Sequence, residues 1–224
     1  MAVIYLIRHG QASFSEDDYD ALSPLGFEQA KKLGEQLGRL QLTPDLVVAG
    51  AMRRHRETCE TALAAMHRSD TPWQKDARLN EYDHEEVLRT HWPLFADKPG
   101  MREWFIQQEH PKRAFSSIFA QAISHWQENN YDYQESWQDF CARVEAGFAD
   151  LCAQAVGNTL VFTSGGVISV ILRQILHLEV DSFQAFSRTL VNTGVTRVVL
   201  RDGMPMIASV NEQLHLPKVM ISYR

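Results

Sequence analysis

The sequence predicts an α/β fold in which helices cover both faces of a mainly parallel β-sheet. Apolar, partly β-branched runs occupy residues 3–7, 45–49 and 159–163, and unbroken runs of this kind are typical of strands buried on both faces. A segment with helical spacing of apolar residues follows each run. Because alternating strands and helices favour right-handed crossover units, we expect a three-layer α/β/α sandwich with 3–7 near the centre of the sheet.

Helices are expected at residues 25–40, 51–66 and 167–178. The first carries leucine and alanine at helical spacing behind Ser23, a favoured N-cap, and Pro24, which suits the first helical position. The second is rich in arginine and glutamate, and the third is mainly apolar.

The middle and the end of the chain depart from this alternation. Residues from about 84 to 135 form a helical stretch rich in aromatics and interrupted by prolines, which predicts a helical insertion within a single domain spanning 1–224. Near the end, Asp202-Gly203 separates the strand-like segments 195–200 and 204–210. Since Asp-Gly favours a tight hairpin turn, we expect an antiparallel pair at the edge of the sheet.

Composition limits the classes of function. A formal net charge of -6 over 224 residues argues against a general nucleic-acid binder, although a basic pocket for a small anion remains compatible with it. Cys59, Cys141 and Cys152 are widely spaced and odd in number, which indicates reduced thiols. The apolar run at 2–7 is too short for a signal or membrane segment. We therefore expect a cytoplasmic protein without a membrane partner.

Two glycine-containing turns follow predicted buried strands, Arg8-His9-Gly10 and Ser164-Gly165-Gly166. Ligands of open α/β sheets bind beyond the carboxyl ends of the strands, so these turns are predicted neighbours. An imidazole can act as a nucleophile, and an arginine fork beside it suits an anion with several oxygens. The pair indicates a phosphate-handling pocket.

The segment Leu6–Ala12 and several later segments occur in an order that resembles one known family. The later segments are Leu22-Ser23 with Gly26 and Gln29-Ala30, Ala51–Thr58, Arg78–Glu81, Glu135-Ser136 with Arg143-Val144, Leu160–Ile168, and Asn211 with His215-Leu216. Together they resemble the histidine phosphatase superfamily, which includes the cofactor-dependent phosphoglycerate mutases. The resemblance implies a phosphoglycerate mutase-like fold with the helical insertion as a cap.

The resemblance implies a phosphomonoesterase that acts on a small phosphorylated substrate without metal or cofactor. His9 would take up the phosphoryl group, and Arg8 and Arg54 would neutralise its oxygens. Glu81 would protonate the leaving oxygen and then activate water. Two polar side chains near the signature are candidates for further substrate contacts: Gln11 and Ser15.

The local sequence leaves two of these roles open. Arg54 lies in the polar run 53–56, which by itself indicates a solvated helix face. Glu81 has nearby competitors for a general acid in Asp83 and Glu85-Glu86. A general acid needs a raised pKa, which burial or a neighbouring carboxylate would provide.

One departure from the family pattern concerns the second glycine turn. Where the family has Ser-His-Gly-Gly, this chain has Thr163-Ser164-Gly165-Gly166, so that Ser164 replaces a second imidazole. Losing such a donor costs about 10²- to 10³-fold in turnover. Ser164 can still donate through its hydroxyl, and the amides of Gly165 and Gly166 at the start of the next helix favour an anion. Either the enzyme stays active, with Ser164 or an imidazole such as His84 or His215 covering the position, or the pocket binds phosphorylated ligands but hardly turns them over.

Other functions fit the sequence less well. Ser164 before a glycine resembles a serine-hydrolase elbow, but Phe162 stands where that motif needs glycine. Glycine-rich nucleotide motifs are missing, so no nucleotide cofactor is implied. Mutase activity would need contacts that hold a sugar acid, and the sequence does not identify them. Hydrolysis is therefore the favoured reaction.

Overall fold

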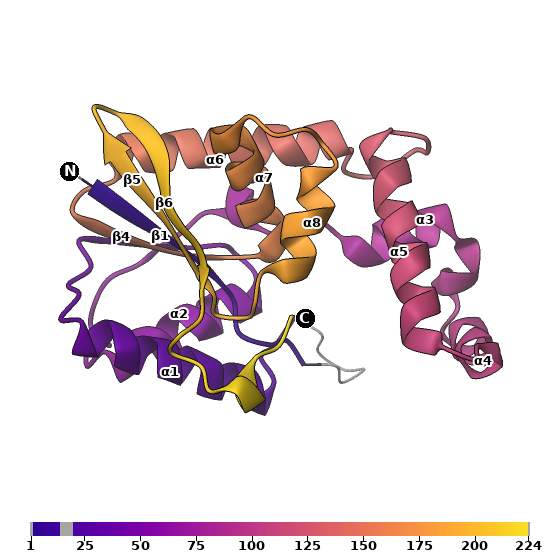
Figure 1. Cartoon of the computed structure of the whole chain (residues 1–224), viewed down its shortest axis with the longest axis horizontal. Helices are drawn as coiled ribbons and strands as arrows, with labels where there is room; N and C mark the ends of the chain where they lie inside the picture. Colours follow the sequence, from indigo (N-terminus) through magenta and orange to yellow (C-terminus); the bar gives the residue numbers. More distant parts are fainter. Residues whose placement is uncertain (1, 14–19, 224) are drawn as a thin grey trace. The chain divides into compact units, whose positions relative to one another are not determined.

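The computed structural model describes residues 2–13 and 20–223, and these form two compact units. The first unit comprises Met1–Glu81 and Arg143–Arg224, and the second comprises Tyr82–Ala142. The second unit is thus an insertion in the sequence of the first, and it contains the helical insertion expected at 84–135. Figure 1 shows the first unit built around a twisted sheet and the second built from helices alone.

A six-stranded sheet organises the first unit, in the order β3-β2-β4-β1-β5-β6. Its strands are β1 (Ala2–Arg8), β2 (Leu46–Ala49), β3 (Gln74–Lys75), β4 (Asn158–Thr163), β5 (Val195–Arg201) and β6 (Met204–Glu212). The first four are mutually parallel where they pair, whereas β5 pairs antiparallel with β1 and with β6. The mainly parallel sheet with an antiparallel edge pair is confirmed, and β1 is central as expected.

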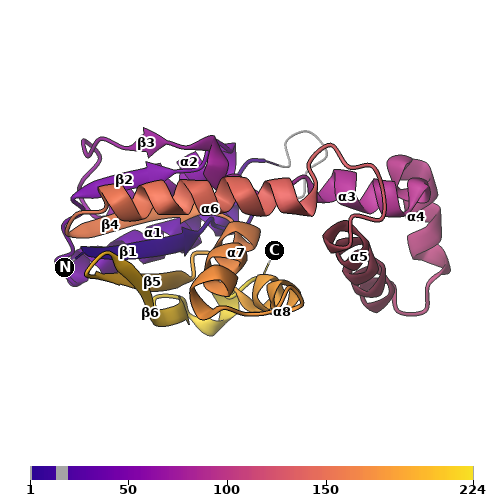
Figure 2. The same ribbon diagram turned by 90° about the horizontal axis from the view of Figure 1, so that it is seen from above.

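Helices cover both faces of this sheet, which confirms the three-layer sandwich. Helices α1 (Pro24–Arg39) and α2 (Arg53–Ala65) lie on one face, and α7 (Gly165–Leu176) and α8 (Ser182–Thr189) on the other (Figures 1 and 2). The part of α6 (Trp137–Gln154) that belongs to this unit also covers the second face. These layers leave the carboxyl ends of β1 and β4 at one end of the sandwich.

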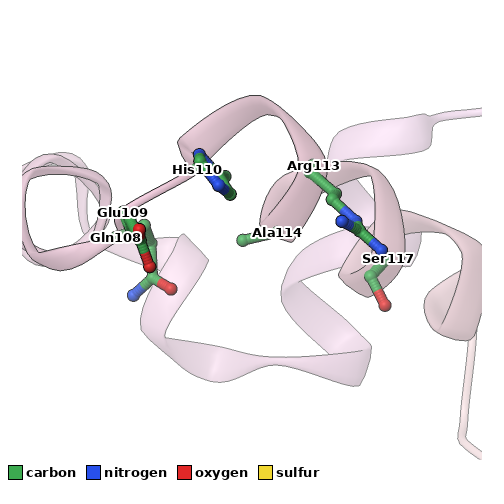
Figure 3. A pocket seen from close by; sticks show the side chains of 6 residues that line it. All are labelled: Gln108, Glu109, His110, Arg113, Ala114 and Ser117. Carbon is green, nitrogen blue, oxygen red and sulfur yellow. The ribbon is translucent and has the colours of Figure 1, made fainter.

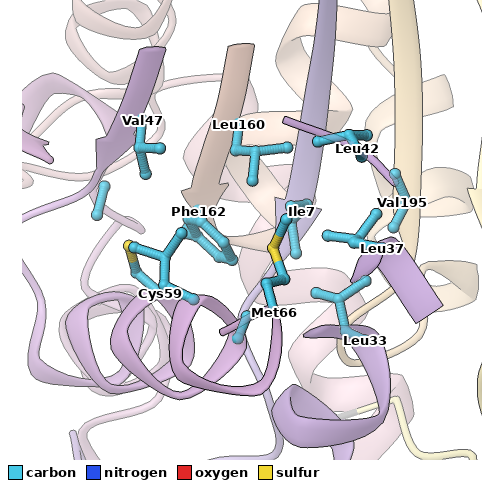
Figure 4. Packing of buried hydrophobic residues seen from close by; sticks show 13 residues of the cluster. Ile7, Leu33, Leu37, Leu42, Val47, Cys59, Met66, Leu160, Phe162 and Val195 are labelled. Carbon is cyan, nitrogen blue, oxygen red and sulfur yellow. The ribbon is translucent and has the colours of Figure 1, made fainter. Parts of the chain in front are cut away.

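A buried apolar cluster fixes α1 and α2 against the sheet (Figure 4). Ile7 of β1 and Phe162 of β4 meet Leu33 of α1 and Cys59 of α2, all almost without solvent exposure. Full burial of a side chain of this size contributes roughly 1.5–3 kcal/mol. Ile7 directly precedes the first glycine turn and Phe162 lies two residues before the second, so the same packing that stabilises the fold also holds the strand ends in place.

The second unit contains α3 (His84–His91), α4 (Lys98–Gln107), α5 (Pro111–Gln127) and the start of α6. Its core is aromatic. The fully buried Trp126 ring lies 4.6 Å from Tyr82, 5.1 Å from Trp137 and 5.5 Å from Phe140, measured between centroids. In the described part of the chain, no helix combines the length and the apolar character needed to cross a bilayer.

Local signals place several boundaries correctly. Ser23 caps α1 by accepting a hydrogen bond from the Gly26 amide at 3.1 Å. Asp202 and Gly203 both have positive φ angles, 53° and 78°, as a two-residue hairpin turn that matches strand twist requires. Neither β3, which has only two residues, nor α8 was expected from the sequence pattern.

Two glycines bring the turn after β1 against the start of α1. A Cβ at Gly10 would lie 2.5 Å from the Gly26 carbonyl oxygen, and a Cβ at Gly26 would lie 2.2 Å from the Gln11 carbonyl oxygen. Neither backbone oxygen can yield as a flexible side chain would. The close approach therefore depends on the absence of a side chain at both positions.

We expect Gly26→Ala to lower the free energy of unfolding by about 1–3 kcal/mol, because the added methyl overlaps backbone. The measurement is urea denaturation. Gly38→Ala is the matched control in the same helix, since its Cβ would meet only the Met66 Cα, at 3.7 Å. Equal effects of the two substitutions would contradict the steric account.

Candidate active site

The site begins with the pairing of β1 and β4. Arg8 lies opposite Thr163 in the parallel register, and the His9 amide donates to the Thr163 carbonyl oxygen at 2.8 Å. The residues that follow, His9 and Ser164, therefore stand side by side where the two strands end. This arrangement brings together the two glycine turns.

The His9 ring is fixed in one tautomer by its own turn. Its Nδ1 lies 2.7 Å from the Gly10 carbonyl oxygen, which can only accept, so Nδ1 carries the proton. Burial, followed by the charges of Arg54 and Arg8, holds the His9 pKa well below its ordinary value. The ring is therefore neutral near pH 7, and Nε2 carries a lone pair.

Two buried arginines accompany this imidazole. Arg8 is 8% exposed and donates to the Leu190 carbonyl oxygen, and Arg54 is 4% exposed. Arg54 Nη1 lies 3.0 Å from an oxygen of Asp20, and Arg54 Nε has no hydrogen-bond partner among the described residues. A Cβ built on Gly165 would lie 3.4 Å from Arg8 Nε, so the start of α7 borders the guanidinium. The two positive charges favour an anion.

Arg54 is not on a solvated face of α2, contrary to what its polar neighbours indicate. Arg53 and Arg56 are exposed, whereas Arg54 and His55 are buried together with Thr58 one turn later. The Thr58 hydroxyl donates to the Arg54 carbonyl oxygen at 2.7 Å and accepts from the Gly10 amide at 3.0 Å. One face of α2 is thus fastened to the turn that carries His9.

An imidazole that the sequence did not single out lies at this site. His55 has no solvent exposure, and its Nε2 is 2.6 Å from the Ser164 hydroxyl oxygen. Its ring centroid lies 5.7 Å from that of His9. The helical spacing of His55 with Cys59 and Ala62 is the signal that could have found it, but its arginine neighbours obscure that pattern.

Glu81 is held near the N-terminus of α7. One of its carboxylate oxygens accepts from the Gly166 amide at 3.0 Å. Arg143 supports the preceding backbone by donating to the carbonyl oxygens of Arg78 and Asn80 at 2.9 and 2.8 Å. The Gly166 amide at the start of α7 thus holds a carboxylate in this structure.

The other candidate residues have different surroundings. His215 Nε2 lies 3.0 Å from the Thr193 hydroxyl oxygen, and among the described residues its ring makes no hydrogen bond or ring contact with His9 or Ser164. His84 begins α3 in the second unit. The side-chain amide oxygen of Gln11 accepts from the Ser23 hydroxyl at 2.9 Å, and Ser15 lies outside the described residues.

Two of the hollows on the described surface are lined by none of the phosphate-site residues. One of about 370 Å³ lies in the second unit, where His110 and Arg113 stand at the start of α5 (Figure 3). The other, about 720 Å³, is bordered by α1 and the segment that includes His215. Among the described residues, no three His, Cys, Asp or Glu side chains converge as metal ligands would.

Comparison with known proteins identifies the family. The model of the histidine phosphatase superfamily (branch 1) matches residues 4–213. The chain belongs to this superfamily. A broad-specificity phosphatase of Saccharomyces cerevisiae is 26% identical over 208 residues, which cover 87% of this chain and 78% of the yeast protein.

Solved structures of this superfamily share the fold. A phosphoserine phosphatase from Entamoeba histolytica, solved with 3-phosphoglyceric acid, has a TM-score of 0.64 at 18% identity, covering 97% of this chain and all of its own. A phosphoglycerate mutase from Bacillus anthracis has a TM-score of 0.62 at 18% identity, covering 96% and 94%. The phosphoglycerate mutase-like fold expected from the sequence is confirmed.

We expect His215 to make the protein less stable in acid. Burial lowers the pKa of this residue to about 4, whereas an unfolded histidine titrates near 6.5. Protonation therefore favours the unfolded chain as the pH falls from 7 toward 4, at a cost of about 2 kcal/mol at pH 5. Urea denaturation at pH 7 and pH 5 measures this loss.

His215→Gln keeps an amide to bond Thr193 but cannot titrate, so it should lose less stability over the same pH range. The exposed His110→Gln serves as the control, because it removes a histidine that the fold does not bury. A pH dependence that is the same in His215→Gln and in the native protein would contradict the prediction.

Proposed function

We propose that this protein is a phosphomonoesterase that transfers the phosphoryl group of a small substrate to His9 and then to water. The observation that carries the proposal is a neutral His9 with its lone pair on Nε2, buried beside Arg8 and Arg54. Membership of the histidine phosphatase superfamily and the phosphatase activity named for the yeast relative support the same reaction.

The first step is a displacement at phosphorus. His9 Nε2 forms the N–P bond while the bond from phosphorus to the leaving oxygen breaks, and Glu81 gives that oxygen its proton. Arg8 and Arg54 neutralise the equatorial oxygens of the phosphoryl group. Because both guanidinium groups are buried, their charges act with little screening by water.

The second step returns the enzyme to its starting state. Glu81, now a carboxylate, takes a proton from water as the water oxygen attacks phosphorus and the N–P bond breaks. The lone pair returns to His9 Nε2, and inorganic phosphate leaves. Arginine supplies the positive charge in both steps, so the proposed mechanism uses no metal ion.

We further propose that residues 1–224 work as one domain, with the helical unit inserted between Glu81 and Arg143. The acidic net charge of -6 and the small, buried anion site favour a small phosphorylated metabolite over a nucleic acid as the substrate. The free thiols of all three cysteines favour a cytoplasmic location.

Replacing the nucleophile tests the proposal directly. We expect His9→Ala to lower kcat/KM for p-nitrophenyl phosphate by about 10³-fold or more, because the covalent route is lost. Acid quenching during turnover should trap an acid-labile phosphohistidine in the native protein and none in the variant. His110→Ala, in the hollow of the second unit, should retain full activity.

If the native protein hydrolyses no ester in a panel of phosphomonoesters but phosphate or a phosphorylated ligand raises its Tm, the protein is a phospho-ligand binder. Hydrolysis that survives in His9→Ala would also contradict the assignment of the nucleophile.

The role of Glu81 has a separate signature. We expect Glu81→Gln to reduce kcat by about 10²- to 10⁴-fold for an alkyl phosphate, whose leaving oxygen needs a proton. The reduction of the phosphorylation rate should be much smaller for p-nitrophenyl phosphate, whose leaving group departs as an anion. Rapid-quench kinetics on both esters measure the difference, and the exposed Glu85→Gln is the control.

A further inference from the structure

The contact between His55 and Ser164 joins two elements that are far apart in the sequence. His55 lies in the first turn of α2, and Ser164 occupies the N-cap position of α7. Both are fully buried, and 2.6 Å separates the imidazole Nε2 from the hydroxyl oxygen. A serine at an N-cap usually bonds an amide of its own helix, yet the Ser164 side chain makes no such bond. Its hydroxyl is therefore directed to His55.

The surroundings of His55 determine which partner donates. Its Nδ1 has no hydrogen-bond partner among the described residues. If Nδ1 carried the proton, a buried N–H would be left unsatisfied, which is more costly than an unused acceptor. The favoured tautomer thus has a bare Nδ1 and an Nε2–H that donates to Ser164 Oγ. The serine proton is then left to point away from His55.

Gly50 makes room for this imidazole. A Cβ at Gly50 would lie 2.1 Å from His55 Nδ1 and 2.8 Å from its Cε1. Gly50 directly follows β2 and is held by a hydrogen bond from its amide to the Phe162 carbonyl oxygen at 2.9 Å. A glycine at 50, a histidine at 55 and a serine at 164 therefore form one sterically matched set.

We infer that His55 is a positioning residue for Ser164, and that the pair supplies the donor to the phosphoryl oxygens that a histidine at position 164 would otherwise provide. This inference rests on the proposed function. By donating to Ser164 Oγ, His55 fixes the rotation of the hydroxyl and polarises its O–H bond. Because Ser164 adjoins His9 across the β1–β4 register, the Ser164 hydroxyl can donate its proton in a hydrogen bond to the phosphoryl group that His9 receives.

The pair explains how the site can work without an imidazole at position 164. The imidazole of His55, on α2, takes its place and acts through the Ser164 hydroxyl. A histidine introduced at 164 alone would overlap His55, because only 2.6 Å separates the two side chains in the native protein. Ser164→His should therefore lower activity, whereas the double substitution His55→Ala with Ser164→His removes the overlap and should restore it.

The test compares five variants with the native protein: His55→Ala, His55→Gln, Ser164→Ala, Ser164→His, and His55→Ala with Ser164→His. Cys59→Ala is the matched control, since Cys59 is fully buried one turn along the same helix but faces the apolar core (Figure 4). Steady-state hydrolysis of p-nitrophenyl phosphate gives kcat and KM. Calorimetry gives the Kd of vanadate, which adopts the geometry of the transition state, and of inorganic phosphate. Thermal unfolding monitors folding of each variant.

We expect Ser164→Ala to lower kcat by about 10²-fold with little change in KM. His55→Ala should lower kcat by about 10-fold or more, as loss of an outer hydrogen-bond partner does elsewhere. Both substitutions should weaken the binding of vanadate more than that of phosphate. Cys59→Ala should change neither kcat nor the binding of vanadate. His55→Gln retains an N–H near the position of Nε2 and should recover part of the loss. The kcat of the double variant should exceed the kcat of both His55→Ala and Ser164→His by tenfold or more.

The inference is overturned if His55→Ala and Cys59→Ala have the same kcat and the same vanadate Kd, or if the double variant is no better than its parents. An acid-stable phosphoserine at 164 would also overturn it, because Ser164 would then be the nucleophile. Native protein without hydrolytic activity would refute the proposed function instead. The ratio of vanadate to phosphate affinity would still report on the pair.

Discussion

The parallel register of β1 and β4 is the constraint on which the rest of the site depends. It is fixed by hydrogen bonds along the two strands and ends with the bond from the His9 amide to the Thr163 carbonyl oxygen. A slip of one residue would turn Ile7 and Phe162 out of the apolar cluster that holds α1 and α2. The cost of that exposure keeps His9 beside Ser164, although neither side chain contributes to the core.

Burial then determines the chemistry of these side chains. Removal from water lowers the His9 pKa, and the arginine charges lower it further, so that the nucleophile is unprotonated where free histidine would be partly charged. The same low-dielectric surroundings strengthen the attraction between the arginines and an incoming anion. Asp20 partly offsets the positive charge of Arg54, with which it forms an ion pair. Asp20 also accepts a hydrogen bond from the Arg53 amide at 2.7 Å, which fixes the start of α2.

Much of the fold could be predicted because strand and helix signals agree with the tertiary structure. The apolar run before His9 is fully buried at Ile4, Leu6 and Ile7, close to what its composition indicates, and Asp202-Gly203 adopts the backbone that a tight hairpin needs. The two-residue strand β3 could not be predicted, because it is defined only by its pairing with β2. Short segments of this kind take their structure from their neighbours.

Only part of the site could be predicted from the sequence. Arg8 and His9 follow a recognisable strand, whereas Glu81 could be chosen over nearby carboxylates only through the family resemblance. The burial of His55 could not be predicted, because a polar residue flanked by arginines is normally solvated. Only the packing of α2 against the strand ends removes this residue from water. Sequence reasoning recognises polar residues by their local pattern, but buried polar pairs depend on contacts that span a hundred residues.

The glycine that follows β2 restricts how this site can change by single substitutions. Any side chain at position 50 collides with the ring of His55, and any large side chain at position 164 collides with the same ring from the other side. A smaller residue must therefore replace His55 before a larger residue can be accommodated at position 50 or 164. In a series of one-residue changes, the histidine on α2 is the first step, and the intermediate lacks an imidazole at both places.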